Sequence, residues 1–310
     1  MTRAADRSEA APLVIVGPTA SGKSGLATQV AQRLGNCQIV SADAMAVYRG
    51  MDIGTAKPTK EEQARIPHHL IDVVDPGEDF DMAQFQALAH SALAAIETAR
   101  DRAILVGGTG LYVRSIVDNF ETPPQFPEEA SELDTEPDTS VLYARLSELD
   151  PRAAAKMESG NRRRIIRALE VTIGSGRPFS SFGPGVDAYP PTRYVQLGLE
   201  IDRDTMDARI NERFDRQIAA GFLDEVADLR QPFSRSAGQA LGYRELRRHL
   251  DGQLTLEEAV EEAKSRTRRF ARRQQRWFRR DPRIIWLDAL SPALVDDALR
   301  AIAHADHVTA

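Results

Sequence analysis

Short apolar runs recur along the chain, and segments with helical periodicity separate several of them. The runs lie at residues 13–16, 38–42, 69–74, 103–106, 194–200 and 283–287. Strands of this kind, alternating with helices, are typical of a parallel sheet whose two faces are both covered. The pattern therefore predicts an α/β fold in which helices flank a parallel sheet.

The stretch 120–138 interrupts this alternation. It contains four prolines and many acidic residues, which predicts an exposed linker. Helical segments at 141–157 and 162–173 follow, and a stretch rich in Gly, Pro and Ser leads back to the sheet. We therefore predict a discontinuous core of residues 12–119 and 191–310, a helical insertion subdomain at 120–190, and a disordered N-terminal extension at 1–11.

One long helix is predicted near the C-terminal end, over residues 257–280, and Asp281-Pro282 ends it because proline disfavours helix in the preceding residue. On a helical wheel, one face carries three aromatic residues and Gln274, and we expect it in the core, with base stacking as the alternative. The opposite side carries Arg268, Arg269, Arg272, Arg276, Arg279 and Arg280.

Charge is strongly segregated along the chain. Its net charge is −6, yet residues 263–283 alone carry +9. Such a patch favours a polyanionic partner even on an acidic protein. The alternative is a solvated helix with salt bridges, which the scarcity of acidic residues within the arginine face disfavours.

The remaining composition argues against several classes of protein. One cysteine, Cys37, allows neither an internal disulfide nor a thiolate zinc cluster, which fits a cytoplasmic protein. His68 and His69 would point to opposite sides of a strand, and His304 and His307 lie near a C-terminus expected to be mobile, so we expect no histidine metal site. We expect neither a signal peptide nor a membrane span.

A phosphate-binding motif follows the first apolar run directly. It fills every fixed position of G-x-x-x-x-G-K-[ST] and precedes a helical segment, a context that makes a chance match in a glycine turn the weaker interpretation. The loop is predicted to hold a diphosphate or triphosphate, with Lys23 on the outer phosphates and Ser24 as a candidate Mg²⁺ ligand. Its residues are Gly17, Pro18, Thr19, Ala20, Ser21, Gly22, Lys23 and Ser24.

Two more polar residues follow predicted strands. Ligands of open parallel sheets bind where strands end, so Asp43 and Thr109 are candidates for the site. For Asp43, the residues leave a helix cap, a carboxylate that orients Mg²⁺ and a catalytic base as open alternatives. For Thr109, a simple turn hydroxyl is the alternative.

Together these motifs resemble the tRNA dimethylallyltransferase family, also called tRNA isopentenyltransferases. The resemblance extends from about residue 12 to about residue 288. It rests on residues 17–24 (GPTASGKS), 41–43 (SAD), 48–58 (YRGMDIGTAKP), 107–112 (GGTGLY), 167–170 (RALE), 213–214 (RF), 242–245 (GYRE), 273–274 (RQ) and 277–279 (WFR).

The resemblance implies a P-loop NTPase-like core that acts as a monomer on tRNA and dimethylallyl diphosphate with Mg²⁺. The dimethylallyl group would pass to the exocyclic amine of the adenosine immediately 3′ of the anticodon. The phosphate loop would then hold a prenyl diphosphate instead of ATP. Asp43 would accept the amine proton, Thr109 would hydrogen-bond the departing oxygen, and Arg213 would stabilise charge on diphosphate.

The resemblance also implies a set of tRNA contacts. In the insertion, it places the basic cluster Arg162, Arg163, Arg164 and Arg167 against the tRNA. The alternative is that this basic helix docks on the acidic linker of the same subdomain. The implied contacts are Asp43, Ala44, Met45, Ala46, Arg163, Arg164, Arg167, Arg272, Arg273, Gln274 and Arg276.

Two departures from the family pattern concern RNA selectivity. The family usually has glutamine where this chain has Ala46, and an arginine often found in the linker has no counterpart between Glu128 and Asp138. Two other functions remain open on the residues alone: a small-molecule P-loop kinase with a basic lid, and a catalytically silent RNA-binding protein regulated by nucleotide.

Overall fold

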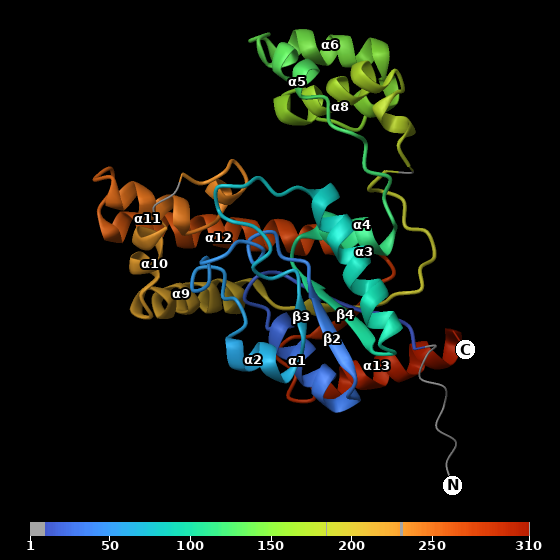
Figure 1. Cartoon of the computed structure of the whole chain (residues 1–310), viewed down its shortest axis with the longest axis vertical. Coiled ribbons are helices and arrows are strands. Elements are labelled where there is room, and N and C mark those ends of the chain that lie inside the picture. The colour runs from blue at the N-terminus through green and yellow to red at the C-terminus, as the bar shows by residue number, and fades with distance from the viewer. Residues whose placement is uncertain (1–9, 184, 230–231, 310) are drawn as a thin grey trace. The chain divides into compact units, whose positions relative to one another are not determined.

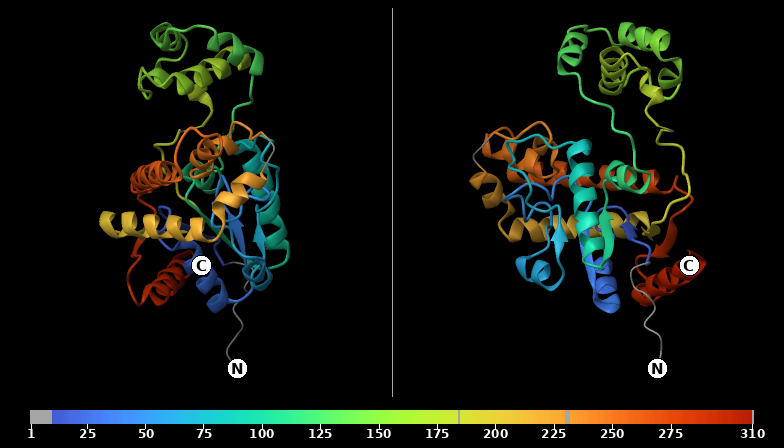
Figure 2. Two further views of the ribbon diagram at one scale, coloured as in Figure 1. Left: turned by 90° about the vertical axis from the view of Figure 1, so that its left-hand side faces the viewer. Right: turned by 45° about the vertical axis from the view of Figure 1, so that its right-hand side comes forward.

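The computed structural model describes residues 10–183, 185–229 and 232–309, which form two compact units (Figures 1 and 2). The core unit comprises the described residues up to Asp118 and from Pro191 onward, and the insertion unit comprises Asn119–Pro190. Most of the predicted extension at 1–11 lies outside the described residues.

The described part of the core unit contains one six-stranded sheet. In sheet order β3-β2-β4-β1-β5-β6, each pair of neighbours is parallel. The loops after β1, β2 and β4 therefore leave the sheet at the same edge. The strands are β1 (Leu13–Val16), β2 (Cys37–Ser41), β3 (His68–His69), β4 (Arg102–Gly107), β5 (Val195–Glu200) and β6 (Ile285–Asp288).

Helices cover both faces of this sheet, as predicted. Leu13 and Ile15 of β1 belong to one apolar cluster, while Val14 and Val16 belong to the other, because successive side chains of a strand point to opposite faces. Helices α1 (Lys23–Leu34), α9 (Arg203–Ala219) and α13 (Leu294–Thr309) pack into the first cluster. Helices α3 (Met82–Thr98), α4 (Gly110–Val117), α10 (Phe222–Asp228), α11 (Tyr243–Leu250) and α12 (Leu256–Phe278) pack into the second.

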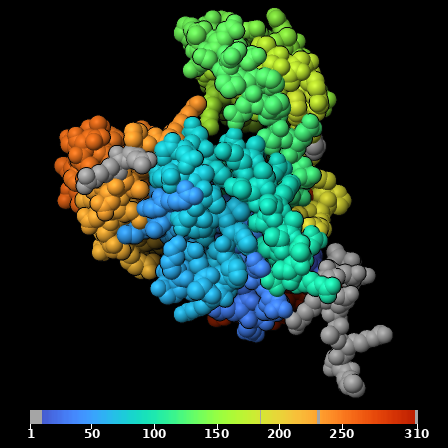
Figure 3. All heavy atoms as spheres, in the orientation of Figure 1, coloured from blue at the N-terminus to red at the C-terminus, as the bar shows by residue number. Residues whose placement is uncertain are grey.

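The segment between β2 and β4 lies at the side of the sheet where β3 is the outermost strand. It contains α2 (Lys60–Arg65) and α3, and in the space-filling view its blue to cyan atoms form the near surface of the core unit (Figure 3). The strand predicted at 69–74 is wrong beyond His69. Leu70 has φ of 63° and Asp72 has φ of 56°, and this left-handed conformation ends the extended backbone.

The insertion unit has its own small core, in which leucines of α5 (Pro127–Asp134), α6 (Thr139–Leu149) and α8 (Arg162–Ser175) pack together. The exposed linker predicted at 120–138 is wrong for α5, because Pro127 is tolerated at a helix start and Leu133 is buried. The single helix predicted at 141–157 is interrupted at Pro151, where α7 (Pro151–Ala154) begins with Asp150 as its cap.

The C-terminal segment was predicted to be mobile, and this is wrong. His304 and His307 lie on α13, whose Asp306 pairs with Arg102 of β4 at 2.7 Å. No helix among the described residues combines the length and the apolar composition needed to cross a membrane.

Candidate functional site

The glycine-rich loop joins β1 to α1, as predicted. Gly22, with φ of 96°, precedes α1 in the left-handed conformation that glycine adopts readily. Two loop amides are used inside the protein, since Thr19 N–H donates to Gln274 Oε1 at 2.9 Å and Ser21 N–H donates to the Pro18 carbonyl at 3.3 Å. The amides at the N-terminus of α1 have no intrahelical acceptor and are available to bind an anion.

Two half-buried cations lie beside this loop. Burial lowers the pKa of Lys23 to about 8, where the Asp43 carboxylate opposes the lowering and Arg213 adds to it. Burial likewise lowers the pKa of Arg213, and Asp43 again opposes it. The Arg213 guanidinium makes no hydrogen bond or ion pair with any described residue. The Lys23 ammonium donates only a long hydrogen bond of 3.4 Å, to the Pro18 carbonyl. Because partial removal of a cation from water is costly, two cations so placed favour a bound anion.

Asp43 and Thr109 occupy adjoining turns at the same edge. Thr109 follows β4, which lies between β1 and β2, and its Oγ1 accepts the Ala44 N–H at 3.3 Å. Asp43 Oδ1 accepts the Met45 N–H at 2.8 Å, so this carboxylate caps a turn and not a helix. The structure thus brings the phosphate loop, Asp43, Thr109 and Arg213 together.

A second loop, residues 51–57, is held by α9, α10 and α11. The Glu225 carboxylate accepts the backbone N–H groups of Asp52, Ile53 and Gly54 at 3.0, 2.6 and 3.1 Å, and it also accepts the Tyr243 hydroxyl. Burial and this carboxylate raise the pKa of Tyr243. Sequence reasoning missed this clamp, although residues 48–58 and 242–245 had both been noted as motifs.

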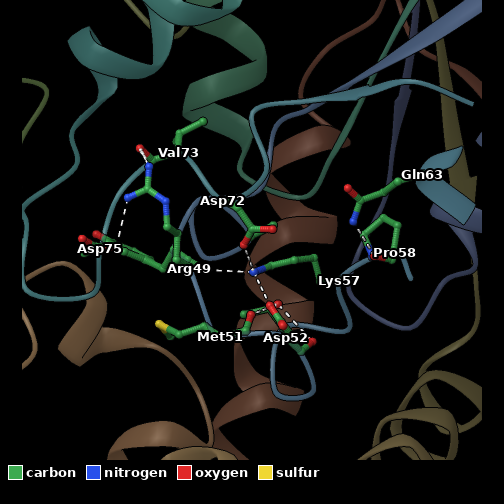
Figure 4. A network of polar contacts seen from close by, with 12 residues as sticks. Arg49, Met51, Asp52, Lys57, Pro58, Gln63, Asp72, Val73 and Asp75 are labelled. Carbon is green, nitrogen blue, oxygen red and sulfur yellow. Dashed lines mark hydrogen bonds and ion pairs between the residues drawn. The ribbon is translucent and has the colours of Figure 1, made fainter. Parts of the chain in front are cut away.

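Lys57 ties the same loop to the segment after β3 (Figure 4). Its side chain is only 3% exposed, and its ammonium donates to the Tyr48 carbonyl at 2.8 Å and to the carboxylates of Asp52 and Asp72. Partial burial alone would raise the pKa of Asp72, but Lys57, with help from Lys60, outweighs it and the pKa is lowered.

We expect Lys57→Met to lower the free energy of unfolding at pH 7 by about 2 kcal/mol, because two partly exposed carboxylates lose a buried counter-charge. A carboxyl whose pKa is lowered by folding stabilises the protein above its unfolded pKa of about 3.9, and this contribution is lost as the pH falls. The difference in free energy of unfolding between the parent and Lys57→Met should therefore be smaller at about pH 3 than at pH 7. Urea unfolding at both pH values measures it.

Lys60→Met is the matched control for this variant. The Lys60 side chain is 79% exposed and pairs with the same Asp72 at 3.4 Å, so we expect almost no change. This account would be contradicted if the parent and Lys57→Met had the same free energy of unfolding at pH 7, or if they differed by the same amount at both pH values.

The arginine face of α12 is partly neutralised by neighbouring elements. Arg272 pairs with Asp207 of α9 at 3.2 Å, Arg268 donates to Asn211, and Arg279 pairs with Glu200 at 2.7 Å. Acidic residues are scarce within the face itself, but neighbouring elements supply acidic partners for Arg272 and Arg279.

Arg273 and Arg276 remain exposed, and neither forms an ion pair with the described residues. After burial, the nearby Arg244, Arg269 and Arg273 are what lower the pKa of Arg266, which shows how densely positive charge is packed here. Arg273 and Arg276 are therefore the stronger candidates for RNA contact on α12.

The arginines of the insertion unit likewise divide into those that pair within the protein and those that are exposed. Arg162 pairs with Asp134 at 3.2 Å, and Arg167 pairs with Glu170 at 2.6 Å and donates to the Pro123 carbonyl. Docking within the unit, the alternative raised above, thus describes these two residues. Arg163 and Arg164 are exposed and form no ion pair within the described chain.

Two other predicted tRNA contacts are buried. Ala46, which stands where the family usually has glutamine, is 5% exposed and faces the core. Gln274 is 7% exposed, and both ends of its amide bond to other parts of the protein, which argues against a direct RNA contact. The sequence does indicate this burial, because Gln274 lies on the same face of the predicted helix as the three aromatic residues.

The parallel sheet, the loop at its first strand and the polar groups at its carboxyl edge define a P-loop protein of the α/β class. Residues 46–281 match the family model described as IPP transferase, and the chain belongs to that family. It is 46% identical over 299 residues to a tRNA dimethylallyltransferase of Bifidobacterium animalis subsp. lactis, covering 94% of this chain and 86% of that protein. The predicted family and fold class are confirmed.

Solved structures agree with this assignment. A tRNA isopentenylpyrophosphate transferase from Bacillus halodurans is 37% identical with a TM-score of 0.72, and the match covers 97% of this chain and 98% of that one. A eukaryotic dimethylallyltransferase acting on tRNA is 27% identical with a TM-score of 0.80, and the match covers 96% and 79%.

Proposed function

We propose that this chain transfers a dimethylallyl group from dimethylallyl diphosphate to the exocyclic N6 amine of the adenosine immediately 3′ of the anticodon in tRNA. Diphosphate is the second product. The relative and the eukaryotic structure reported above are named for dimethylallyl transfer and for tRNA, which supports this reaction class. One observation of this chain carries the proposal furthest: Lys23 and Arg213 lie at the phosphate loop, both interact electrostatically with Asp43, and Arg213 forms no hydrogen bond or ion pair with the described residues.

Each group at the sheet edge has a step to perform in this reaction. As the allylic C–O bond breaks, negative charge grows on diphosphate, where Lys23, Arg213 and the amides at the start of α1 stabilise it. Asp43 removes a proton from the adenine amine, which is a weak nucleophile, as the new C–N bond forms. Thr109 Oγ1 already accepts the Ala44 N–H, so its own hydrogen is free to be donated to the departing oxygen.

The loop also fits a Mg²⁺ ion bound together with substrate. The described residues contain no cluster of His, Cys, Asp and Glu able to hold a metal alone, but Mg²⁺ in phosphate sites typically binds through substrate oxygens, water and few protein groups. Ser24, exposed in the first turn of α1, supplies such a hydroxyl. When bound, the ion would neutralise charge on the leaving group.

Labelled substrates test the proposal and separate it from a kinase. The protein is incubated with Mg²⁺, tRNA and either labelled dimethylallyl diphosphate or labelled ATP. We expect label in RNA only from the prenyl donor. Transfer of phosphate from ATP to an added small-molecule acceptor would favour the kinase, and tRNA binding without any transfer would favour a silent RNA-binding protein. The proposed enzyme acts as a monomer in the cytoplasm.

Arg276→Glu should weaken tRNA binding about tenfold or more at low salt, because an exposed cation with no acidic partner in the described part of the chain is replaced by an anion. The loss should shrink as salt is added, and the slope of log affinity against log salt should fall by about one. Binding titrations of tRNA at several salt concentrations measure both effects.

Arg300→Glu serves as the control for charge reversal. Arg300 is exposed on α13. The ion pair between Arg102 and Asp306 ties α13 to the start of β4, at the amino ends of the strands and therefore opposite the loops of the site. We expect tRNA affinity close to the parent's. If Arg276→Glu binds as tightly as Arg300→Glu, Arg276 does not contact the RNA.

A further inference from the structure

The side-chain amide of Gln274 joins two loops that are far apart in the chain. Its Oε1 accepts the N–H of Thr19 in the phosphate loop at 2.9 Å, and its Nε2 donates to the Gly108 carbonyl at 2.9 Å. Gly108 directly precedes Thr109. One side chain of α12 is therefore bonded to the loop assigned to diphosphate and to the turn assigned to the leaving oxygen.

This junction leaves little room for movement. A Cβ atom on Gly108 would lie 2.3 Å from Gln274 Nε2, and one on Gly110 would lie 2.1 Å from the Trp277 indole nitrogen. Gln274 and Trp277 are neighbours on one face of α12, since they are three residues apart. The two glycines on either side of Thr109 thus admit two side chains of α12 against the turn.

We propose that Gln274 is a positioning residue, which holds the phosphate loop and the Thr109 turn at a fixed separation for dimethylallyl transfer. This inference rests on the proposed function. It replaces the RNA contact predicted for Gln274 with a role inside the site. A buried amide with both ends bonded suits this role, because neither bond can be lost without leaving a polar backbone group unpaired.

Gln274→Met tests the role, because methionine has nearly the same length and no amide. With Thr19 N–H and the Gly108 carbonyl released, small displacements of the two loops should lower kcat about tenfold to 100-fold. The KM for tRNA should stay within about twofold, because Arg273 and Arg276 are untouched. Mg²⁺-pyrophosphate should bind about tenfold more weakly in calorimetry.

Gln275→Met is the matched control. Gln275 is the next residue of the same helix, and its Nε2 donates to the Ile201 carbonyl at 3.0 Å, away from the phosphate loop. This variant also loses an amide hydrogen bond to backbone, so it should unfold at a temperature similar to that of Gln274→Met. We expect its kcat and its pyrophosphate affinity to match those of the parent.

Gln274→Glu adds a pH readout that a merely structural role would not produce. A carboxylate can accept the Thr19 N–H but cannot donate to Gly108, whereas a protonated carboxyl can do both. Desolvation raises the pKa of a buried glutamate. The ratio of the Gln274→Glu rate to the parent rate should therefore rise as the pH falls from about 8 to about 6, while the ratio for Gln274→Met stays flat.

The outcomes separate the two proposals. Prenyl transfer by the parent, with Gln274→Met equal to Gln275→Met in kcat and pyrophosphate affinity, would overturn the role of Gln274 and leave the proposed function standing. Failure of transfer by the parent would refute the proposed function. The pyrophosphate affinities would then decide whether Gln274 organises the phosphate loop, with equal affinities for both variants overturning it.

Discussion

Asp43→Asn should lower the turnover number for dimethylallyl transfer by about 100-fold to 10,000-fold, while the affinity for tRNA stays within about twofold of the parent's. Asparagine retains an oxygen that can accept the Met45 N–H, so the turn after β2 should persist. What it loses is the ability to take a proton from the adenine amine. Single-turnover transfer and tRNA binding, measured on the same preparation, separate the two effects.

Asp75→Asn is the control for this substitution. Asp75 is exposed and pairs with Arg49 at 3.0 Å on the loop beyond β3, so its rate should stay within about twofold of the parent's. If Asp43→Asn transfers at the same rate as Asp75→Asn, Asp43 is not the base.

Arg213→Met should lower turnover by about 100-fold to 1,000-fold, because one of the donors facing the growing charge on diphosphate is removed. Its effect on stability should have the opposite sign from that of a typical core substitution. Arg213 is a half-buried cation with no hydrogen bond or ion pair among the described residues, and burial outweighs the attraction of Asp43 in its pKa. An apolar side chain removes this cost, so thermal unfolding should occur at an equal or higher temperature.

Arg216→Met, on the exposed side of α9 three residues further on, controls for the loss of a positive charge on this helix. It should change neither turnover nor the unfolding temperature appreciably. A variant of Arg213 that is destabilised but fully active would assign this arginine to the fold and not to the reaction.

Much of the fold was predictable because its signals are local. The apolar run before the phosphate loop, the motif itself and the helix after it predict β1 and α1 without knowledge of the rest of the chain. Asp43 and Thr109 were found for a similar reason, since each directly follows a strand and parallel strands bring their carboxyl ends to one edge.

What sequence reasoning missed depends on contacts between distant segments. The wheel of α12 shows its own arginines but not Asp207 and Asn211, which α9 supplies from about sixty residues earlier in the chain. The bonds of Gln274 to Thr19 and Gly108 span 255 and 166 residues. No local pattern reports such pairings, and a polar residue beside an arginine cluster is easily interpreted as part of the RNA surface.

Backbone conformation explains the errors in the elements. Nothing in the composition of residues 69–74 marks the left-handed conformations of Leu70 and Asp72, which turn the chain out of the sheet. In the insertion, the prolines of residues 120–138 favour a linker by composition. Pro127 and Pro151 instead start short helices, because the first helical turn needs no N–H from them.

A crystal structure of the protein with Mg²⁺ and a non-reactive thio analogue of dimethylallyl diphosphate would test the central claim most directly. The account predicts that the diphosphate group accepts hydrogen bonds from the backbone at the start of α1, contacts Lys23 and Arg213, and leaves the allylic carbon facing Asp43. A diphosphate bound away from residues 17–24, or an Asp43 carboxylate turned away from the allylic carbon, would contradict it.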